Sequence, residues 1–419
     1  MAAEPQHIVH TVLDRVAGHL PALGVALSGG GDSVALLHIT ADWCRRRNVR
    51  IEAATVDHGL RAESAAEARA AGAMAARLGI PHRVLRWERA GDRGGNLMAA
   101  ARNARMALLG TWAGQRGLPA VVLGHTQDDQ AETLMIRLAR GSGVDGLSGM
   151  AEARTAQGVL WLRPMLCVGR QELRGWLVAR GIGWIDDPTN ENSDYDRVRM
   201  RQAMRALGLS APALAQSAAN LAEARAALAE AALTTAAGFR ADRGVLWLPA
   251  DGFRAAPAEL RRRLFVAALR WVTGADYPPR REAVAQALDR LRDGGQVTLD
   301  GVIARLQGPE FLFLREPAAA ARAGAAVPWD MGASDAGVVW DRRWRLTGLP
   351  AGATVTALGE KRLAGRDWRA TGLPRKALLF SPAVVRAGHT LAPLLEEATG
   401  MTAMPLRDAQ GFATILRTH

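Results

Sequence analysis

Short apolar runs alternate with amphipathic helical patterns through the first third of the chain. The runs have the length of buried strands and cover residues 24–28, 51–58, 82–88 and 120–125. Each run is followed by residues with helical spacing, at 33–47, 64–79, 96–117 and 128–141. This alternation predicts a doubly wound, mostly parallel α/β sheet with helices on both faces. Ligands of such sheets bind beyond the carboxyl ends of the strands.

The pattern changes after about Arg205. Ala-rich and then Arg-rich stretches with helical spacing follow, and residues 296–316 alternate as strands around a Gly-Pro pair. A segment rich in Ala, Pro and Gly comes next and is typical of a linker. We therefore expect a catalytic α/β domain in residues 1–208, a mainly helical domain in 209–317 and a small α+β domain in 329–419.

Composition narrows the class of protein. The 419 residues include 53 basic and 41 acidic ones, a formal net charge of +12, and 49% are hydrophobic, which excludes global disorder. All basic residues but Lys361 and Lys376 are Arg, which GC-rich coding explains, while the excess over acid permits a polyanionic partner. No apolar run reaches the ~20 residues of a membrane span, and no secretory signal opens the chain. Cys44 and Cys167 form no CxxC pair, and two cysteines cannot make a disulfide framework, so a cytoplasmic enzyme is expected. A homodimer is possible on this sequence.

The strongest local signal is the SGGGDS loop between the first predicted strand and its helix, which comprises Ser28, Gly29, Gly30, Gly31, Asp32 and Ser33. Consecutive glycines allow a tight turn whose N–H groups converge, and such a nest at a helix N-terminus binds phosphate. The alternative is an ordinary strand-to-helix turn, but three glycines and an acid exceed what a turn needs. The loop is not a Walker A motif, because it lacks that motif's lysine.

A second motif follows the second predicted strand. Asp57 and His58 stand at the sheet edge where a nucleotide would lie. Alternatively, Asp57 caps the loop and His58 is a surface residue.

A third motif, GHTQDDQAET, follows the fourth predicted strand. Asp129 and Glu132 are three residues apart and therefore share a helix face. Two carboxylates beside a triphosphate suit Mg²⁺, and Asp32 would complete that site. His125 would move a proton or stabilise charge on the reacting group. Helix capping is the alternative for Asp129, since acids are favoured at helix N-termini.

Together these motifs resemble tRNA(Ile)-lysidine synthetases, a family within the N-type ATP pyrophosphatases. The resemblance rests on SGGGDS, on DHGLR with Ser64, on GHTQDDQAETLMIRLARGSGVDGLSGM, and on residues 163–201, which include DDPTN. It spans most of the first two hundred residues in the family's order, and the later part fits the three-domain form more loosely. It implies a Rossmann-like ATP pyrophosphatase domain.

The resemblance also implies a two-step ligation. ATP adenylates the C2 oxygen of the wobble cytidine (position 34) in an isoleucine tRNA with a CAU anticodon. Free L-lysine then displaces AMP to give lysidine. The SGGGDS loop would hold the ATP phosphates, and Asp57 and His58 would contribute to the nucleotide site.

The remaining roles carry over by position. Asp32 and Asp129 would bind Mg²⁺ and, with Glu132, act on the lysine ammonium. His125 would act near the adenylated base. The lysine or base pocket would be lined by Arg105 and by one of the nearby arginines Arg197, Arg199 and Arg201, of which Arg201 is counted among the catalytic residues.

The chain departs from the family at three positions. Val198 stands where Asn is usual, and Met98 and Met106 replace a frequent Glu and Tyr, while Arg102 and Arg105 are kept. We expect Met106 to fill a core gap.

Two other functions compete with this interpretation. A tRNA sulfur transferase on the same scaffold would need reactive or cluster-binding cysteines, and this chain offers no paired thiols. A noncatalytic RNA-binding protein would not need Asp32, Asp129 and Glu132 together. Clusters of Arg near Trp or Phe, such as ELRRRLFVAALRW, favour tRNA binding by the later domains, although each alone is compatible with a solvated face over a core.

Overall fold

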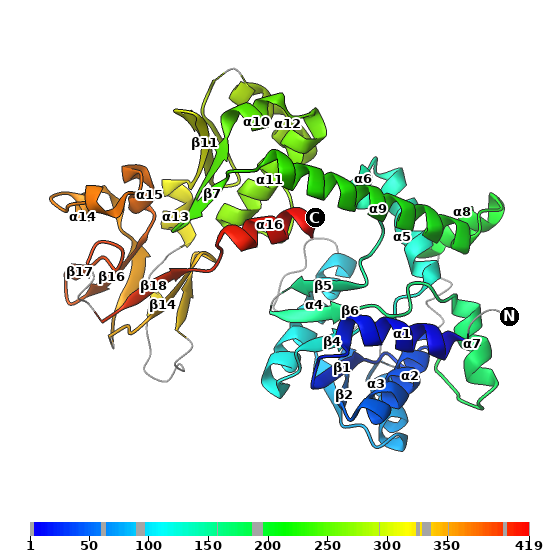
Figure 1. Ribbon diagram of the computed structural model, residues 1–419. Coiled ribbons are helices and arrows are strands. Elements are labelled where there is room, and N and C mark those ends of the chain that lie inside the picture. The colour runs from blue at the N-terminus through cyan, green and yellow to red at the C-terminus, as the bar shows by residue number, and fades with distance from the viewer. Residues whose placement is uncertain are drawn as a thin grey trace. The chain divides into compact units, whose positions relative to one another are not determined.

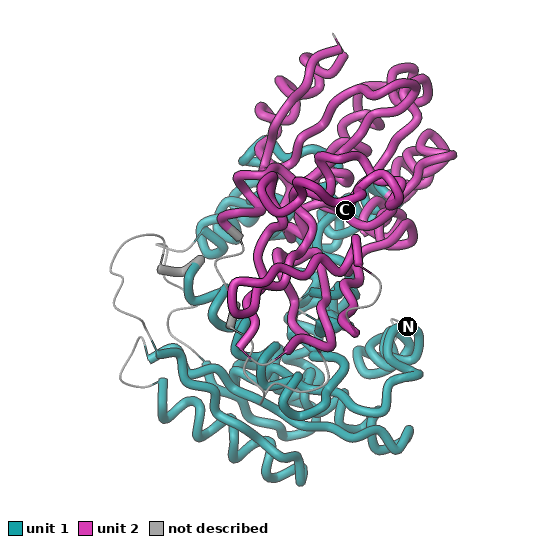
Figure 2. The backbone as a smooth tube through the Cα atoms, turned by 90° about the vertical axis from the view of Figure 1, so that its left-hand side faces the viewer, with its two compact units in different colours: residues 1–225 teal, residues 226–419 magenta. Residues whose placement is uncertain are grey.

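The computed structural model describes residues 4–59, 64–88, 97–156, 158–186, 196–292, 294–323, 327–328, 337–350, 352–396 and 400–418. The chain divides into two compact units, residues 1–225 and 226–419, which Figure 2 colours separately. Helix α9 (Ala211–Thr235) contributes to both units. The division into three domains at the expected boundaries stays a prediction.

Six strands of the first unit form one sheet: β1 (Ala22–Ala26), β2 (Arg50–Asp57), β3 (His82–Arg86), β4 (Ala120–Val122), β5 (Ala153–Ala156) and β6 (Val159–Leu162). Their order is β3-β2-β1-β4-β6-β5, and Figure 1 labels all of these strands but β3. All neighbouring pairs are parallel except β5 with β6, which is antiparallel at the edge. The predicted mostly parallel sheet is confirmed.

The helices of this unit are α1 (Pro5–Ala17), α2 (Gly31–Arg47), α3 (Ser64–Arg77), α4 (Leu97–Arg116), α5 (Gln127–Ala139), α6 (Val144–Leu147), α7 (Arg170–Val178) and α8 (Asp196–Ala206). Burial on both faces of β1 explains why its sequence reads as a continuous apolar run. Leu23 and Val25 pack in a core with α1, α2 and α7. Ala22 and Ala26 pack in a separate core with α4, which includes Trp112. Helices therefore cover both faces, as predicted.

The described part of the second unit contains three antiparallel sheets. The largest has the order β7-β8-β11-β10-β9, built from β7 (Arg240–Asp242), β8 (Val245–Pro249), β9 (Val297–Leu299), β10 (Val302–Gln307) and β11 (Glu310–Arg315). The strands expected in 296–316 are confirmed, with Gly308 and Pro309 at the turn. The β7–β8 hairpin was not expected, because its strands are short and follow a 25-residue helix.

Two smaller sheets have the orders β12-β15-β16-β17 and β13-β14-β18. Their strands are β12 (Val327–Pro328), β13 (Val338–Trp340), β14 (Trp344–Thr347), β15 (Thr354–Ala357), β16 (Pro382–Arg386), β17 (His389–Leu391) and β18 (Thr402–Pro405). The unit's remaining helices are α10 (Ala250–Ala255), α11 (Ala258–Thr273), α12 (Arg281–Arg292), α13 (Pro317–Ala323), α14 (Gly359–Leu363), the 3₁₀ turn η2 (Arg369–Thr371), α15 (Arg375–Leu379) and α16 (Ala409–Arg417).

The last helix of the chain packs against the helical part of this unit. Phe412 and Leu416 of α16 belong to the same buried core as α11. The indole N–H of Trp271 on α11 donates to the carbonyl oxygen of Asp408 at 2.8 Å, just before α16 begins. The C-terminal segment therefore stabilises residues that lie well over a hundred positions earlier in the chain.

Candidate active site

The site lies where the strand order of the first sheet reverses. The chain runs from β1 to β2 on one side and returns to β4 on the other, so β1 and β4 are neighbours. In doubly wound sheets the crevice beyond the carboxyl ends at such a point is the usual ligand site. The loop after β1 is the SGGGDS segment and the loop after β4 carries His125. The two loops touch closely: a Cβ at Gly124 would lie only 3.3 Å from the Cα of Ser33.

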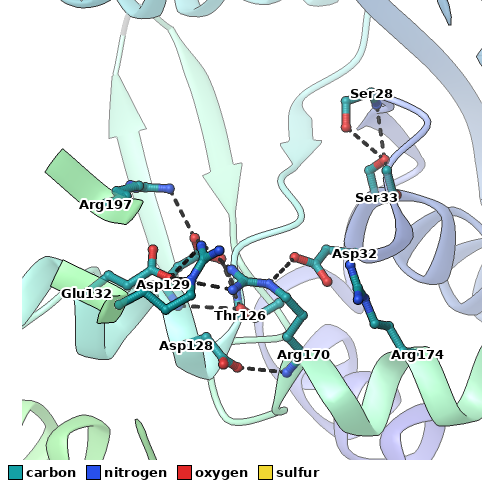
Figure 3. A network of polar contacts seen from close by, with 12 residues as sticks. Ser28, Asp32, Ser33, Thr126, Asp128, Asp129, Glu132, Arg170, Arg174 and Arg197 are labelled. Carbon is teal, nitrogen blue, oxygen red and sulfur yellow. Dashed lines mark hydrogen bonds and ion pairs between the residues drawn. The ribbon is translucent and has the colours of Figure 1, made fainter. Parts of the chain in front are cut away.

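The SGGGDS loop is held in a fixed shape by its own serines. The Ser28 backbone N–H and hydroxyl reach the Ser33 Oγ at 3.1 and 3.0 Å, and Ser33 Oγ donates to the Gly30 carbonyl at 2.9 Å (Figure 3). Gly29 has φ of 87°, a conformation that favours glycine. Helix α2 begins at Gly31, and the first N–H groups of a helix lack partners within it. The predicted residues thus come together at a helix N-terminus suited to an anion.

Helix α5 supplies two buried carboxylates. Its N-cap is Thr126, whose backbone N–H and hydroxyl both donate to Asp129 Oδ2, at 2.8 and 3.0 Å. Asp129 is 6% exposed and Glu132 is 1% exposed, so both carboxylates are removed from bulk water. Glu132 Oε2 is buried and has no hydrogen-bond partner in the described part of the chain. Asp129 Oδ2 therefore takes part in helix capping, as the alternative held, while Oδ1 is contacted by arginine side chains.

Arg170, the first residue of α7, lies between the acids of the two loops (Figure 3). Its Nε donates to Asp32 Oδ2 at 3.0 Å, and its other nitrogens lie 3.5 Å from Asp129 Oδ1 and from Glu132 Oε1. Its backbone N–H donates to Asp128 Oδ2 at 2.7 Å. One residue therefore joins three carboxylates by its side chain and a fourth by its main chain.

Helix α8 adds two more cations to the acid cluster. Arg197 donates to Asp129 Oδ1 at 3.0 Å, and Arg201 donates to Glu132 Oε1 at 2.9 Å. Arg199 pairs with Asp196 on its own helix. Of the three candidate arginines, the structure brings Arg197 and Arg201 to the acids. Val198, the departure from the family pattern, is buried at 7% exposure.

Burial and charge shift the acids in opposite directions. Burial raises the pKa of Asp32, and the cation of Arg170 offsets only part of this effect. Burial also acts on Asp129, but Arg197 and Arg170 outweigh it, so the pKa of Asp129 is lowered. Arg170 loses solvation by burial, but its carboxylate neighbours hold its pKa above the ordinary value. The cluster therefore favours the charged forms of Arg170 and Asp129, whereas the pKa of Asp32 is shifted towards its protonated form.

His125 and Arg105 lie close enough to this cluster to interact electrostatically with its members. Burial, with smaller effects from Arg163, Arg197 and Arg105, lowers the pKa of His125 to about 3 despite the nearby Asp129. His125 is therefore neutral at physiological pH, and its Nδ1 is buried without a partner among the described residues.

Arg105 lies close enough to His58 and His125 to lower the pKa of each. Burial lowers its own pKa, and repulsion by Arg102 and Arg197 adds to the effect. No carboxylate of the described residues pairs with it. Arg105 therefore presents an unmatched positive charge beside the site.

Asp57 and His58 lie at the end of β2. Asp57 Oδ1 accepts from the Gly59 N–H at 2.9 Å and from the Ser64 hydroxyl at 2.8 Å, which lowers its pKa. This is the loop-capping arrangement named above as its alternative. The His58 ring lies edge-on to Trp87 with 6.0 Å between centroids, and burial lowers its pKa. Leu60 and Arg61 of the DHGLR motif lie outside the described residues, as does 187–195, which holds most of DDPTN.

Met106 packs partly buried against the core beside α4, as expected, whereas nothing is described of the Met98 side chain. Sequence reasoning missed the central residue of the cluster, Arg170. Its only signal was its place inside the GRQELR segment that carries the resemblance.

The predicted Mg²⁺ was tested against the donor set. No group of three or more His, Cys, Asp or Glu side chains among the described residues is arranged to hold a metal ion. Mg²⁺ usually binds one or two carboxylates and completes its shell with water and substrate phosphates. Asp32 and Asp129 are carboxylates beside a phosphate-type loop, so the donor chemistry fits a metal that arrives with a nucleotide.

The comparisons with known proteins agree with this geometry. Residues 6–207 match the PP-loop domain family. A curated tRNA(Ile)-lysidine synthase of Ruegeria pomeroyi is 43% identical over 410 residues, covering 95% of this chain and 94% of the relative. The chain belongs to the tRNA(Ile)-lysidine synthase family.

Two further members of this family show the same relationship. The synthase of Brucella anthropi is 35% identical over 399 residues, which cover 89% of this chain and 85% of that protein. The synthase of Bradyrhizobium diazoefficiens is 48% identical over 189 residues, covering 45% of this chain and 52% of that protein. The family predicted from the motifs is therefore confirmed, and with it the use of ATP that is common to PP-loop proteins. Within the part of the chain that the structure describes, no helix is both long and apolar enough to cross a membrane.

Proposed function

We propose that this chain is an ATP-dependent ligase. It joins L-lysine to C2 of the wobble cytidine of the isoleucine tRNA with a CAU anticodon, through an adenylated tRNA, and releases AMP and pyrophosphate. The observation that carries the proposal is the acid and arginine cluster directly beside the phosphate-type loop, in a chain of the lysidine synthase family. A cytoplasmic location follows from the tRNA substrate and stays a prediction, as does a homodimer.

The first step needs a site for the ATP phosphates. The backbone N–H groups at the start of α2 suit these anions. Mg²⁺, bound through Asp32 and Asp129, would neutralise phosphate charge. The C2 oxygen of cytidine attacks the α-phosphorus, and the bond to pyrophosphate breaks. Arg105, with its unmatched charge, would stabilise the anionic adenylate.

The second step needs a site for lysine. Lysine carries ammonium groups, and Glu132 has one buried oxygen without a partner. That oxygen would accept a hydrogen bond from the lysine, with Asp129 as a second anion nearby. The side-chain ammonium of lysine gives a proton to Glu132 or solvent, and the free amine then attacks C2; the C–N bond forms, the bond from C2 to the adenylate oxygen breaks, and AMP leaves. Neutral His125 would hydrogen-bond the base without adding charge at this step.

The sulfur-transfer alternative finds little support in the thiols. Burial raises the pKa of Cys44 to about 12, and burial together with Glu152 raises that of Cys167. A thiol is nucleophilic as the thiolate, so the raised pKa values disfavour reaction of either side chain at neutral pH. Both are free in the described structure.

One assay tests the proposal. The protein is incubated with ATP, Mg²⁺, labelled lysine and a transcript of the CAU isoleucine tRNA. Label should enter this tRNA and should be absent when the anticodon is changed to GAU or when ATP is left out. Asp32→Ala should abolish adenylate formation while leaving tRNA binding within about threefold. No label in the CAU tRNA, or sulfur incorporation from a persulfide donor, would overturn the proposal.

A further inference from the structure

A cavity of about 400 Å³ opens in the second unit, and all the residues that line it belong to that unit. It is formed by α10, α11, α12 and β11. Its apolar lining comes from side chains that also belong to the core or border it: Phe253, Val284, Leu288 and Phe311. Its volume lies within the range of small-ligand sites, which is about 300–1,000 Å³.

The charges around this cavity do not balance. Five arginines line it, against two acids. Glu259 is already engaged by Arg262, whose Nε lies 2.8 Å from Oε2, and Asp289 lies 3.4 Å from Arg292.

Three lining arginines remain without a carboxylate partner among the described residues: Arg254, Arg261 and Arg281. Arg261 is fixed by hydrogen bonds to the backbone carbonyls of Arg254 and Ala256, at 3.1 and 2.8 Å. The Arg254 guanidinium lies over the Phe311 ring, 5.6 Å from its centroid. The rim is therefore a concentrated positive charge above an apolar floor.

That combination matches one ligand chemistry. A nucleotide has a flat base that fits an apolar slot and stacks on guanidinium planes, and a phosphate that takes bidentate hydrogen bonds from arginine. A bare phosphate would use the arginines alone and would make no contact with the apolar lining. We propose that this cavity binds one unstacked nucleotide of the RNA substrate, with the base on the apolar lining and the phosphate on Arg254 and Arg281. The proposal rests on the proposed function, because it takes the RNA to be the tRNA substrate.

The test measures equilibrium binding of the CAU isoleucine tRNA to the full chain by fluorescence anisotropy, over a series of salt concentrations. Arg254→Gln with Arg281→Gln should weaken binding at least tenfold and lower the slope of log affinity against log salt by about two. Arg290→Gln is the matched control for the single change Arg281→Gln, since each removes one charge from α12 and Arg290 does not line the cavity. It should weaken binding less than threefold.

A second pair of variants tests insertion of the base. Ala285→Trp fills the cavity without changing charge, and it should weaken binding at least fivefold while leaving the salt slope unchanged. Gln286→Trp places the same ring on the neighbouring residue, outside the lining, and should bind as the parent does. Thermal melting of each variant checks that it is folded.

The possible results separate the cavity inference from the proposed function. Weakening by the arginine pair without any effect of Ala285→Trp would mean a phosphate-contacting surface and would overturn the nucleotide site. Saturation of the cavity by free AMP with unchanged tRNA binding would assign it to a free nucleotide and also overturn it. If all cavity variants bind as the parent does while the parent still forms lysidine, the cavity inference fails and the proposed function stands. A parent that binds no tRNA overturns both.

Discussion

Arg170→Met is the most informative single change, because it removes the cation that joins the two loops and nearly preserves side-chain volume. Removing one partner of a buried ion pair costs about 3–5 kcal/mol, since a charge is left buried without compensation. The lower end of this range applies here, because the Arg170 and Asp32 side chains are still 18% and 24% exposed. Asp129 and Glu132 also keep other arginine partners. In the variant, Asp32 has no ion-pair partner, since Arg170 is its only one among the described residues. We expect a loss of about 3 kcal/mol.

This loss is measurable by thermal unfolding. For a folded unit of 225 residues, about 1 kcal/mol shifts Tm by roughly 2–4 °C, so Arg170→Met should lower the Tm of the first unit by roughly 6–12 °C. Arg174→Met is the matched control on the same helix. Its partner Asp186 is 3.4 Å away and 73% exposed, so the control should change stability by less than about 1 kcal/mol.

A double variant separates the charge effect from lost packing. Arg170→Met with Asp32→Asn removes the stranded carboxylate together with the cation. It should recover at least about 1 kcal/mol relative to the sum of the two single changes. Additive losses in the double variant, or an Arg170→Met protein that melts within 2 °C of the parent, would refute this account of the cluster.

Three further predictions follow from the same site. Because the folded-state pKa of His125 is about 3, the unfolded chain binds a proton below pH ~6.5 that the folded chain does not. The free energy of unfolding should therefore fall by up to about 1.4 kcal/mol per pH unit on acidification. His125→Asn should flatten this pH dependence, as measured by urea unfolding at several pH values. Gly124→Ala places a methyl group against the backbone of Ser33, so steady-state kinetics should show a KM for ATP raised about tenfold with the KM for lysine unchanged. Glu132→Gln should raise the KM for lysine at least tenfold and that for ATP less than threefold; equal effects would contradict its role as a lysine ligand.

The sequence predicted most of the scaffold, because each strand and helix of the first sheet has its own local signal. Apolar runs, helical spacing and a glycine-rich loop are all short-range features. The same holds for Asp129 and Glu132, whose separation of three residues sets a shared helix face. His125 was found because it directly follows a strand.

Arg170 could not be found in this way, because its importance is entirely long-range. It lies 138 residues from Asp32, and only the packing of α7 against the sheet core brings the two together. The β7–β8 hairpin was missed for a different reason. Its two-residue turn is Arg243-Gly244, both with positive φ, and Arg at the first position hides a signal that Asn-Gly would have given.

The close approach of Gly124 to Ser33 makes the conformation of each loop depend on the other. A side chain at position 124 would press on main-chain atoms, which no rotamer change can move aside. A graft of the SGGGDS loop into another scaffold would therefore need the loop after β4 to travel with it. A library that varies only one loop keeps the close backbone contact made by the other. Useful variants should therefore arise from paired changes on both sides of this contact.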